Sequence, residues 1–161
     1  MPSRILIDKT INAIIRPSAD LFVKNLDTLS EKDAQRIIKS LLEIDNDPIL
    51  FELKVTKNES FELYKRLNEQ LDVRLDLLRQ SLKDKDHTNN VFVFMILRKS
   101  EEIMLPSWDE KLKKDDIVLI GCDQHAFEEI EFIANNFHEF EFAYFGKDHS
   151  VLKNIFGKEK Q

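Results

Sequence analysis

The sequence is poor in cysteine, glycine and long apolar runs, and each scarcity excludes a class of function. The single cysteine, Cys122, can form neither an internal disulfide nor a CxxC metal or redox site. The three glycines, Gly121, Gly146 and Gly157, cannot make a GxGxxG loop, so classical dinucleotide binding is excluded. No apolar run reaches the roughly 18–20 residues that span a bilayer, and the N-terminus does not resemble a secretory signal. We therefore expect a soluble, cytoplasmic protein.

Basic residues are also fewer than acidic residues. The chain has 30 acidic and 24 basic residues, giving a net charge of -6. Nucleic-acid binding needs clustered Lys and Arg to neutralise phosphates, so we expect no nucleic-acid partner. Hydrophobic residues make up 42% of the 161 residues and charged residues 34%, which predicts a packed core beneath a charged surface. The length suits one compact domain or two small lobes.

Residues 1–47 are predicted to form an N-terminal helical segment. The apolar residues 5–15 indicate a short strand, and a helix can begin at Pro17 because proline suits a first turn. Ser30 is a predicted N-cap for a second helix. The apolar residues that follow it recur at the spacing of one buried helical face: Ala34, Ile37, Ile38, Leu41 and Leu42. The polar run at 45–48 ends this helix and marks our candidate boundary between two lobes.

Residues 48–136 alternate between predicted strands and helices. Strands are expected over 49–55, 91–97, 103–105 and 117–120. Helices are expected after Ser60 and over 124–136, with Ser60 and Asp123 as their predicted N-caps. The 91–97 strand is continuously apolar, as expected for a strand covered on both faces. Leucines spaced by three or four residues allow the first helix to run to about Leu82 or to end near Leu71. This order of elements predicts an α+β fold.

Residues 137–161 are expected to form a C-terminal strand and helix extension. Phe140, Phe142 and Tyr144 alternate with polar residues, which indicates a strand, and residues 151–156 suit a short helix. Strand alternation would place Glu139 and Glu141 on one face. With His138, Asp148 and His149 they could bind a divalent cation, since carboxylates and imidazoles are metal ligands. The alternative is a polar edge strand whose charges oppose aggregation.

Three stretches share a pattern with a known family. Residues 55–71 contain a strand, then Ser60 and a short helix with Leu67 and Leu71, similar to a family helix that ends in Leu-x-x-Leu. Residues 94–106 contain a strand, Arg98, an acidic turn and an apolar strand that ends in proline. Residues 112–123 read LKKDDIVLIGCD, similar to a Leu-x-x-Gly-Asp-x-Leu-x-x-x-Gly pattern. Together these stretches resemble the TrkA-C domain, the C-terminal lobe of the RCK regulatory domains of potassium channels and transporters.

The resemblance covers about half of the chain and has two departures. Asp115 stands where the family usually has glycine, and the region 72–90 is longer than is typical. Residues 1–47 faintly resemble the end of the nucleotide-binding lobe that precedes this domain in the family. The resemblance therefore leaves open that the chain is a piece of a longer channel subunit.

The resemblance implies a function and a ligand site. It implies a homodimeric regulatory module, at the inner face of the membrane, that gates a channel or transporter when it binds cyclic di-AMP, another nucleotide or a divalent cation. Asp72 and Arg74 match the family's aspartate-x-arginine after the first helix, and Asn90 matches an asparagine before the next strand. An arginine can fork onto phosphate, and an asparagine can contact a base edge or ribose. The alternative is a solvated arginine and a loop asparagine.

The remaining candidates favour structural roles. Cys122, Asp123 and His125 are best interpreted as a capped helix with a buried cysteine, because no residue nearby completes a catalytic triad. Trp108 is expected to be a packing anchor. No nucleophile, base and orienting group occur at diagnostic spacings, so we expect no enzyme. The leucines of 63–82 suit either the core or a dimer surface, and a structural assembly module without a small ligand is the alternative function.

Overall fold

A computed structural model of the chain describes residues 17–44 and 48–146. The strand expected over 5–15, the helix expected over 151–156, and the candidate ligands Asp148 and His149 lie outside these residues. The division of the chain at 47 and at 136 into a helical segment, a regulatory lobe and an extension stays a prediction.

The centre of the fold is a four-stranded sheet. Its strands are β1 (Ile49–Lys54), β2 (Val91–Arg98), β3 (Glu101–Met104) and β4 (Ile117–Cys122), in the order β1-β4-β2-β3. All neighbouring strands are antiparallel. Helices precede, interrupt and follow this antiparallel sheet along the chain, and β2, β3 and β4 follow one another without a helix between them, so the predicted α+β class is confirmed.

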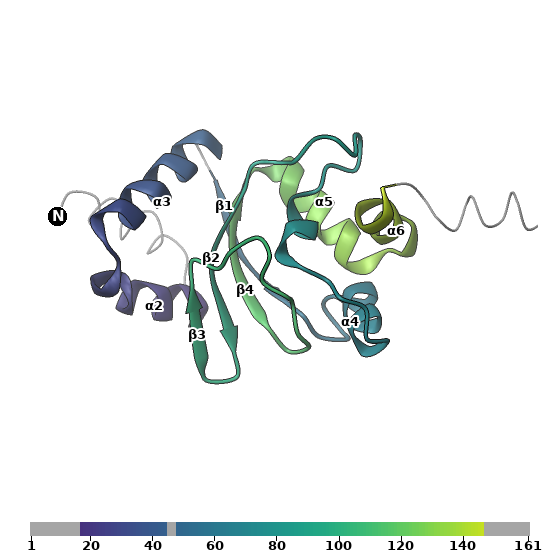
Figure 1. Ribbon diagram of the computed structural model, residues 1–161, viewed down its shortest axis with the longest axis horizontal. Helices are drawn as coiled ribbons and strands as arrows, with labels where there is room; N and C mark the ends of the chain where they lie inside the picture. Colours follow the sequence, from purple (N-terminus) through teal and green to yellow (C-terminus); the bar gives the residue numbers. More distant parts are fainter. Residues whose placement is uncertain (1–16, 45–47, 147–161) are drawn as a thin grey trace, which may run out of the picture.

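Helices cover both faces of the sheet (Figure 1). One face carries α2 (Pro17–Lys24), the short 3₁₀ helix η1 (Leu26–Thr28) and α3 (Glu31–Ile44). The other face carries α4 (Phe61–Asn68), the 3₁₀ helix η2 (Leu75–Arg79), α5 (Gln124–Asn135) and α6 (Phe137–Phe145). The sheet thus separates two hydrophobic cores, and the apolar 91–97 run is buried on both sides as predicted.

A β-bulge in β2 distributes its side chains between the two cores. The register with β4 shifts between Val93 and Met95. Strict alternation would send Phe94 and Met95 to opposite faces, but a bulge adds one residue to the strand. Both side chains therefore belong to the α2–α3 core, while Val93 and Ile96 belong to the core of the opposite face.

Two of the three predicted N-caps follow the expected chemistry, whereas the Ser60 hydroxyl donates to the Lys54 carbonyl at 2.7 Å and does not cap α4. The Ser30 hydroxyl accepts a hydrogen bond from the Asp33 amide at 3.1 Å, and the Asp123 carboxylate accepts one from the Ala126 amide at 2.7 Å. In α3 the predicted face is buried at Ala34, Ile37 and Leu41. Leu42 was expected on this face and is 75% exposed, because it lies at the edge of the stripe.

The long helix considered for residues 61–82 is wrong, and the shorter alternative is close to the structure. α4 ends at Asn68, and Gln70 adopts a left-handed φ of 70°. The chain then pairs with a distant segment, since the Leu112 amide donates to the Val73 carbonyl at 2.8 Å and the Leu75 amide to the Glu110 carbonyl at 2.9 Å. The leucines of this segment enter the core, as the default interpretation predicted.

The strand predicted over 140–145 is also wrong, because these residues form α6. The helix places Phe140 and Ala143, three residues apart, in the core. Phe140 and Tyr144, four residues apart, stack with ring centroids 5.8 Å apart. Gly146 ends the helix with a φ of 87°, a conformation that glycine adopts at low cost. Aromatic residues that alternate along a sequence can therefore also meet on one helical face.

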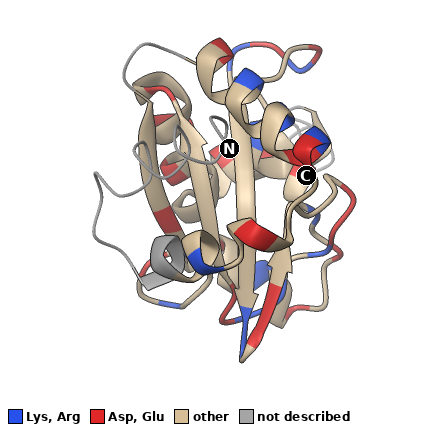
Figure 2. Ribbon diagram, turned by 90° about the vertical axis from the view of Figure 1, so that its left-hand side faces the viewer, with Lys and Arg blue, Asp and Glu red and all other residues tan. Residues whose placement is uncertain are grey.

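The surface carries both signs of charge. Figure 2 shows acidic and basic residues interspersed over the side of the molecule that carries α2 and α3. In the part of the chain that the structure describes, no helix combines the length and apolar character needed to cross a membrane.

Candidate functional site

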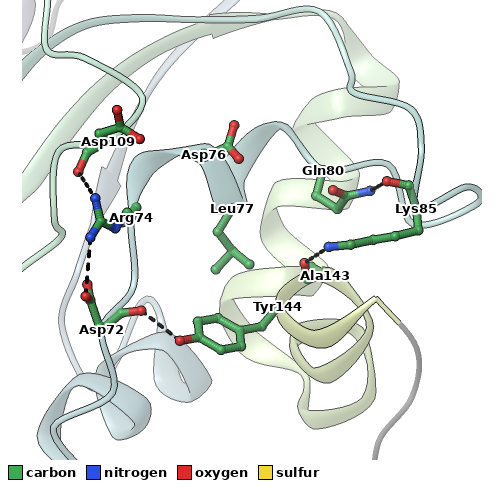
Figure 3. A pocket seen from close by; sticks show the side chains of 9 residues that line it. All are labelled: Asp72, Arg74, Asp76, Leu77, Gln80, Lys85, Asp109, Ala143 and Tyr144. Atoms are coloured by element: carbon green, nitrogen blue, oxygen red, sulfur yellow. Dashed lines mark hydrogen bonds and ion pairs between the residues drawn. The ribbon is translucent and has the colours of Figure 1, made fainter.

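Asp72 and Arg74 lie together at the rim of a hollow, as their sequence positions suggested. We call this cavity of about 320 Å³ the Arg74 hollow (Figure 3). It lies between the segment that leads into η2 and the end of α6. Its lining is Asp72, Arg74, Asp76, Leu77, Gln80, Lys85, Asp109, Ala143 and Tyr144.

The charged groups of the Arg74 hollow have partners within the chain. Arg74 lies 3.6 Å from the Asp72 carboxylate and donates a long hydrogen bond of 3.4 Å to the Asp109 carbonyl. Lys85 Nζ donates to the Ala143 carbonyl at 2.9 Å, and the Tyr144 hydroxyl donates to the Asp72 carbonyl at 2.9 Å. Figure 3 shows these contacts around the rim of the hollow. These contacts hold the rim together, so Arg74 and Lys85 each already have an acceptor within the chain.

Asn90 lies in a different cavity from Arg74. This second cavity has a volume of about 240 Å³, and we call it the arginine cleft. It shares no lining residue with the Arg74 hollow, although η2 contributes to both. No Asp or Glu lines it among the described residues. Its lining is Arg36, Ser40, Arg79, Thr88, Asn89, Asn90, Val91, Phe92, Val93, Pro106 and Trp108.

Arg79 is held in place at the arginine cleft by its neighbours. Its Nε donates to the Asp76 carboxylate, and its guanidinium lies over the Trp108 ring, 4.5 Å from the centroid. Its carbonyl accepts a hydrogen bond from the Asn89 amide at 2.7 Å. Among the described residues, the hydrogen bond to Asp76 uses only Nε of the guanidinium, which leaves the donors of its two Nη groups for another partner.

Arg36 reaches the arginine cleft from the other layer of the fold. It lies on α3, one turn before Ser40, and its guanidinium is 5.9 Å from the centroid of the Phe92 ring. Arg36 is exposed, and it forms no ion pair with any residue that the structure describes. The cleft is therefore lined by two arginines: Arg36, which has no carboxylate partner among the described residues, and Arg79, whose orientation is fixed.

The wall that carries Asn89 and Asn90 is anchored by a buried carboxylate. Glu129 on α5 is 6% exposed. It accepts hydrogen bonds from the Asn89 side chain at 2.9 Å and from the Leu82 amide at 3.1 Å, and His125 Nε2 lies 3.1 Å away. This carboxylate fixes both ends of the polar loop. Asn89 is thereby committed to structure, whereas Asn90 is exposed at the cleft.

The predicted cation ligands do not come together. Glu139 and Glu141 are two residues apart on the α6 helix, which turns them to different sides, and the strand that would align them does not exist. Glu141 is buried and pairs with Arg66 at 2.8 Å, and Arg66 also pairs with Glu62 at 2.8 Å. His138 is exposed on the same helix. Among residues 17–44 and 48–146, no group of three or more His, Cys, Asp or Glu side chains could hold a metal ion.

Cys122 is fully buried. Burial, and secondarily the charge of Asp123, raises the pKa of the Cys122 thiol to about 12. An activated thiol requires the opposite shift. His125 contacts Glu129 on its own helix, so the expected capped helix with one buried cysteine is confirmed.

Two residues from the family-like stretches form a buried ion pair. Arg98 donates from Nε and Nη2 to the two carboxylate oxygens of Asp116, each at 2.9 Å. The Asp116 side chain is fully buried and also accepts the Lys113 amide at 2.8 Å. Hydrogen bonding to Asp116 raises the pKa of Arg98. The pair ties the end of β2 to the turn before β4, which makes it a structural element and not a ligand site.

Sequence reasoning missed Arg36, Arg79 and the place of Trp108 in a cleft. Arg36 lies on the polar side of an amphipathic helix, where an arginine is usually solvated. Arg79 falls inside the leucine-rich segment that allowed a long helix. Trp108 does pack, beneath Arg79, but it also lines the cleft. No local spacing connects these three residues, because separate elements bring them together.

Comparisons with family models, with curated proteins and with solved structures gave no match. The site must therefore be interpreted from its own geometry and from the family-like stretches of the sequence.

Proposed function

We propose that this chain is a regulatory ligand-binding module of a potassium channel or transporter, and that a small anionic ligand binds in the arginine cleft. One observation carries the proposal. Among the described residues, Arg36 and Arg79 line one small cleft whose lining contains no carboxylate. Arg36 forms no ion pair with a described residue, and Arg79 pairs only through Nε with the exposed Asp76 carboxylate, so both guanidinium groups keep donors for an anion.

Two structural details support the link to the TrkA-C family. Asp115, which stands at the family's glycine position, has a left-handed φ of 71°. Glycine adopts this conformation most easily and aspartate better than most residues, which would explain the family pattern. Arg98 and Asp116, from two of the three similar stretches, pair with one another. A sequence pattern that has a structural reason in this fold supports the resemblance better than the pattern alone.

The proposed contacts differ from those that the sequence suggested. Asn90 stays a proposed ligand contact, because it lines the arginine cleft. Asp72 and Arg74 pair with each other at the rim of another cavity, and Arg79 replaces Arg74 as the proposed arginine. Divalent cations are the weaker ligand class, since the described residues offer no cluster of metal ligands.

The position of the cleft suggests how a ligand would act. Arg36 and Ser40 belong to the α2–α3 layer, whereas Arg79 and Trp108 belong to the segments of the opposite layer. A ligand that contacts both sides adds an attraction between the layers. Because a ligand shifts an equilibrium only by its differential affinity for two states, it would favour the state in which α3 is docked. In a homodimer, this docking would be passed to the membrane partner.

Thermal unfolding of the purified chain tests the proposal. The panel is AMP, ADP, ATP, cyclic di-AMP, NAD, inorganic phosphate, Ca²⁺, Mg²⁺, Mn²⁺ and Zn²⁺. At about a hundred times its dissociation constant a ligand adds roughly 2.7 kcal/mol, or about 5–10 °C in a chain of this size. Arg36→Ala and Arg79→Ala should lose the shift, and Arg74→Ala should keep it. Loss in Arg74→Ala alone, or no shift with any anion, would contradict the proposal.

The second candidate is a structural assembly module. Three phenylalanines at the ends of the α4, α5 and α6 helices favour it, because Phe61, Phe132 and Phe137 are 49%, 49% and 40% exposed. Exposed aromatic side chains are common at protein interfaces. A molecular mass that rises with concentration in light scattering, together with no ligand response, would select this candidate.

A further inference from the structure

We infer that the ligand of the arginine cleft is a phosphate monoester of mononucleotide size, with its phosphate at Arg36 and Arg79 and its planar ring against the aromatic wall. The inference rests on the proposed function and names the class of ligand. It draws on three properties of the cleft: its charge, its wall and its volume.

The charge of the cleft suits a phosphate. Arg36 has no carboxylate partner among the described residues, and Arg79 uses only Nε, for Asp76. The Asp76 carboxylate is 57% exposed, so water weakens its effect on Arg79. A phosphate monoester carries between one and two negative charges at neutral pH and offers three acceptor oxygens. Guanidinium groups match these oxygens with pairs of donors, and three acceptor oxygens can be shared between the two arginines.

The wall of the cleft suits a planar ring. Trp108 is the half-buried aromatic residue of this wall, whereas Phe92 and Pro106 are buried behind it. The Arg79 guanidinium lies 4.5 Å from the centroid of the Trp108 ring, and the Arg36 guanidinium lies 5.9 Å from the centroid of the Phe92 ring. A planar ligand ring can lie on the open face of either guanidinium and extend the stack. The Asn90 amide offers one acceptor and two donors for the edge of such a ring.

The volume limits the size of the ligand. At about 240 Å³, the cleft is smaller than the roughly 300–1,000 Å³ of ordinary ligand pockets. A phosphate with one sugar and one ring fills such a space and leaves an edge exposed. A dinucleotide, including cyclic di-AMP, is too large for the cleft of one chain. The volume therefore favours a mononucleotide over a dinucleotide.

Trp108 provides a direct reporter, because it is the only tryptophan of the chain and it lines the cleft. We would titrate the protein with AMP, GMP, CMP and UMP, and compare ribose 5-phosphate, adenosine, succinate and sulfate. A mononucleotide should change the Trp108 fluorescence saturably. Ribose 5-phosphate should bind about tenfold more weakly for lack of the ring, and adenosine and succinate should bind at least tenfold more weakly than the mononucleotide. Thermal unfolding with the same compounds is the second measurement.

Variants separate the cleft from the rest of the surface. Arg36→Ala and Arg79→Ala should each weaken mononucleotide binding by at least about tenfold, Arg36→Lys should recover part of the loss, and Arg74→Ala should bind as the unchanged protein does. Succinate binding as tightly as the mononucleotide would overturn the phosphate assignment but leave an anion site in the cleft. Equally tight binding of adenosine would overturn the phosphate assignment but leave a ligand site there. No response to any compound by either measurement, in a protein that unfolds cooperatively, would overturn the proposed function as well.

Discussion

The two cavities beside η2 contain similar residues and differ in how their charges are paired. The Arg74 hollow has two cations and three aspartates, and its cations contact acceptors of the chain itself. The arginine cleft has two cations and no carboxylate in its lining, and Arg36 has no ion-pair partner among the described residues. The larger cavity with more charged residues is thus the weaker candidate for a ligand site. Unsatisfied charge, and not the number of charged residues, marks a candidate site.

The difference follows from where the residues come from. Asp72 and Arg74 are neighbours in an extended segment, so they pair locally. Arg36 and Arg79 belong to two layers of the fold, and the packing of α3 on the sheet brings them to one cleft. A site built between layers also links ligand binding to the docking of those layers.

Charge reversal should give the largest contrast between the two cavities. Arg36→Glu replaces a cation that has no ion-pair partner among the described residues with an anion. A charge-assisted hydrogen bond contributes about 1.5–3 kcal/mol, and each 1.4 kcal/mol is a factor of about ten. With the added repulsion, we expect mononucleotide affinity in calorimetric titration to fall by more than about a hundredfold. The matched change Arg74→Glu should alter it by less than about twofold. Equal losses in both variants would remove the distinction between the cavities.

Removing an anchoring residue should lower the free energy of unfolding more at the arginine cleft than at the Arg74 hollow. Glu129→Ala removes a buried acceptor from the Asn89 side chain and the Leu82 amide, and leaving such donors unpaired costs about 1–3 kcal/mol. Lys85→Ala removes an exposed group from the Arg74 hollow and should cost less than about 1 kcal/mol. Urea unfolding measures both values. A larger loss for Lys85→Ala would show that the hollow, and not the cleft, is the more firmly built of the two.

The rate at which a thiol reagent labels the buried Cys122 should be the same in variants of the two cavities. With a pKa of about 12, Cys122 is protonated in the folded protein, so a thiol reagent at about pH 8 reacts only when the chain opens. Because the fold favours the protonated thiol, this contribution to stability is complete below the ordinary pKa of about 8.5 and is lost as the pH rises toward 12. Labelling rates should be equal for Arg36→Ala, Arg79→Ala and Arg74→Ala. Faster labelling of the cleft variants alone would mean that they lose structure as well as binding.

Most elements could be predicted from the sequence where local chemistry decides them. The capped starts at Ser30 and Asp123, and the doubly covered strand at 91–97, depend on side chains near in sequence. The end of α4 could not be predicted, because the chain leaves the helix to pair Val73 and Leu75 with residues near 111. Helix α6 was mistaken for a strand because its apolar residues fit both periods.

The candidate site was only partly visible in the sequence. Asn90 was found through the family resemblance, and it does line the arginine cleft. Arg74 was chosen for its position after the first helix, but Arg79, on the other side of η2, reaches the cleft. Arg36 could not be found, since only the packing of α3 against β2 gives it a role. Residues that meet through tertiary packing leave no spacing to recognise.

Hydrogen–deuterium exchange with and without saturating AMP tests the central claim most directly, because it locates the ligand. The account predicts slower exchange of backbone amides in α3 and in residues 88–93, which lie on the two sides of the arginine cleft. It predicts no change in α6, which lines the Arg74 hollow. Slower exchange in α6 and around Arg74, with α3 unchanged, would contradict it.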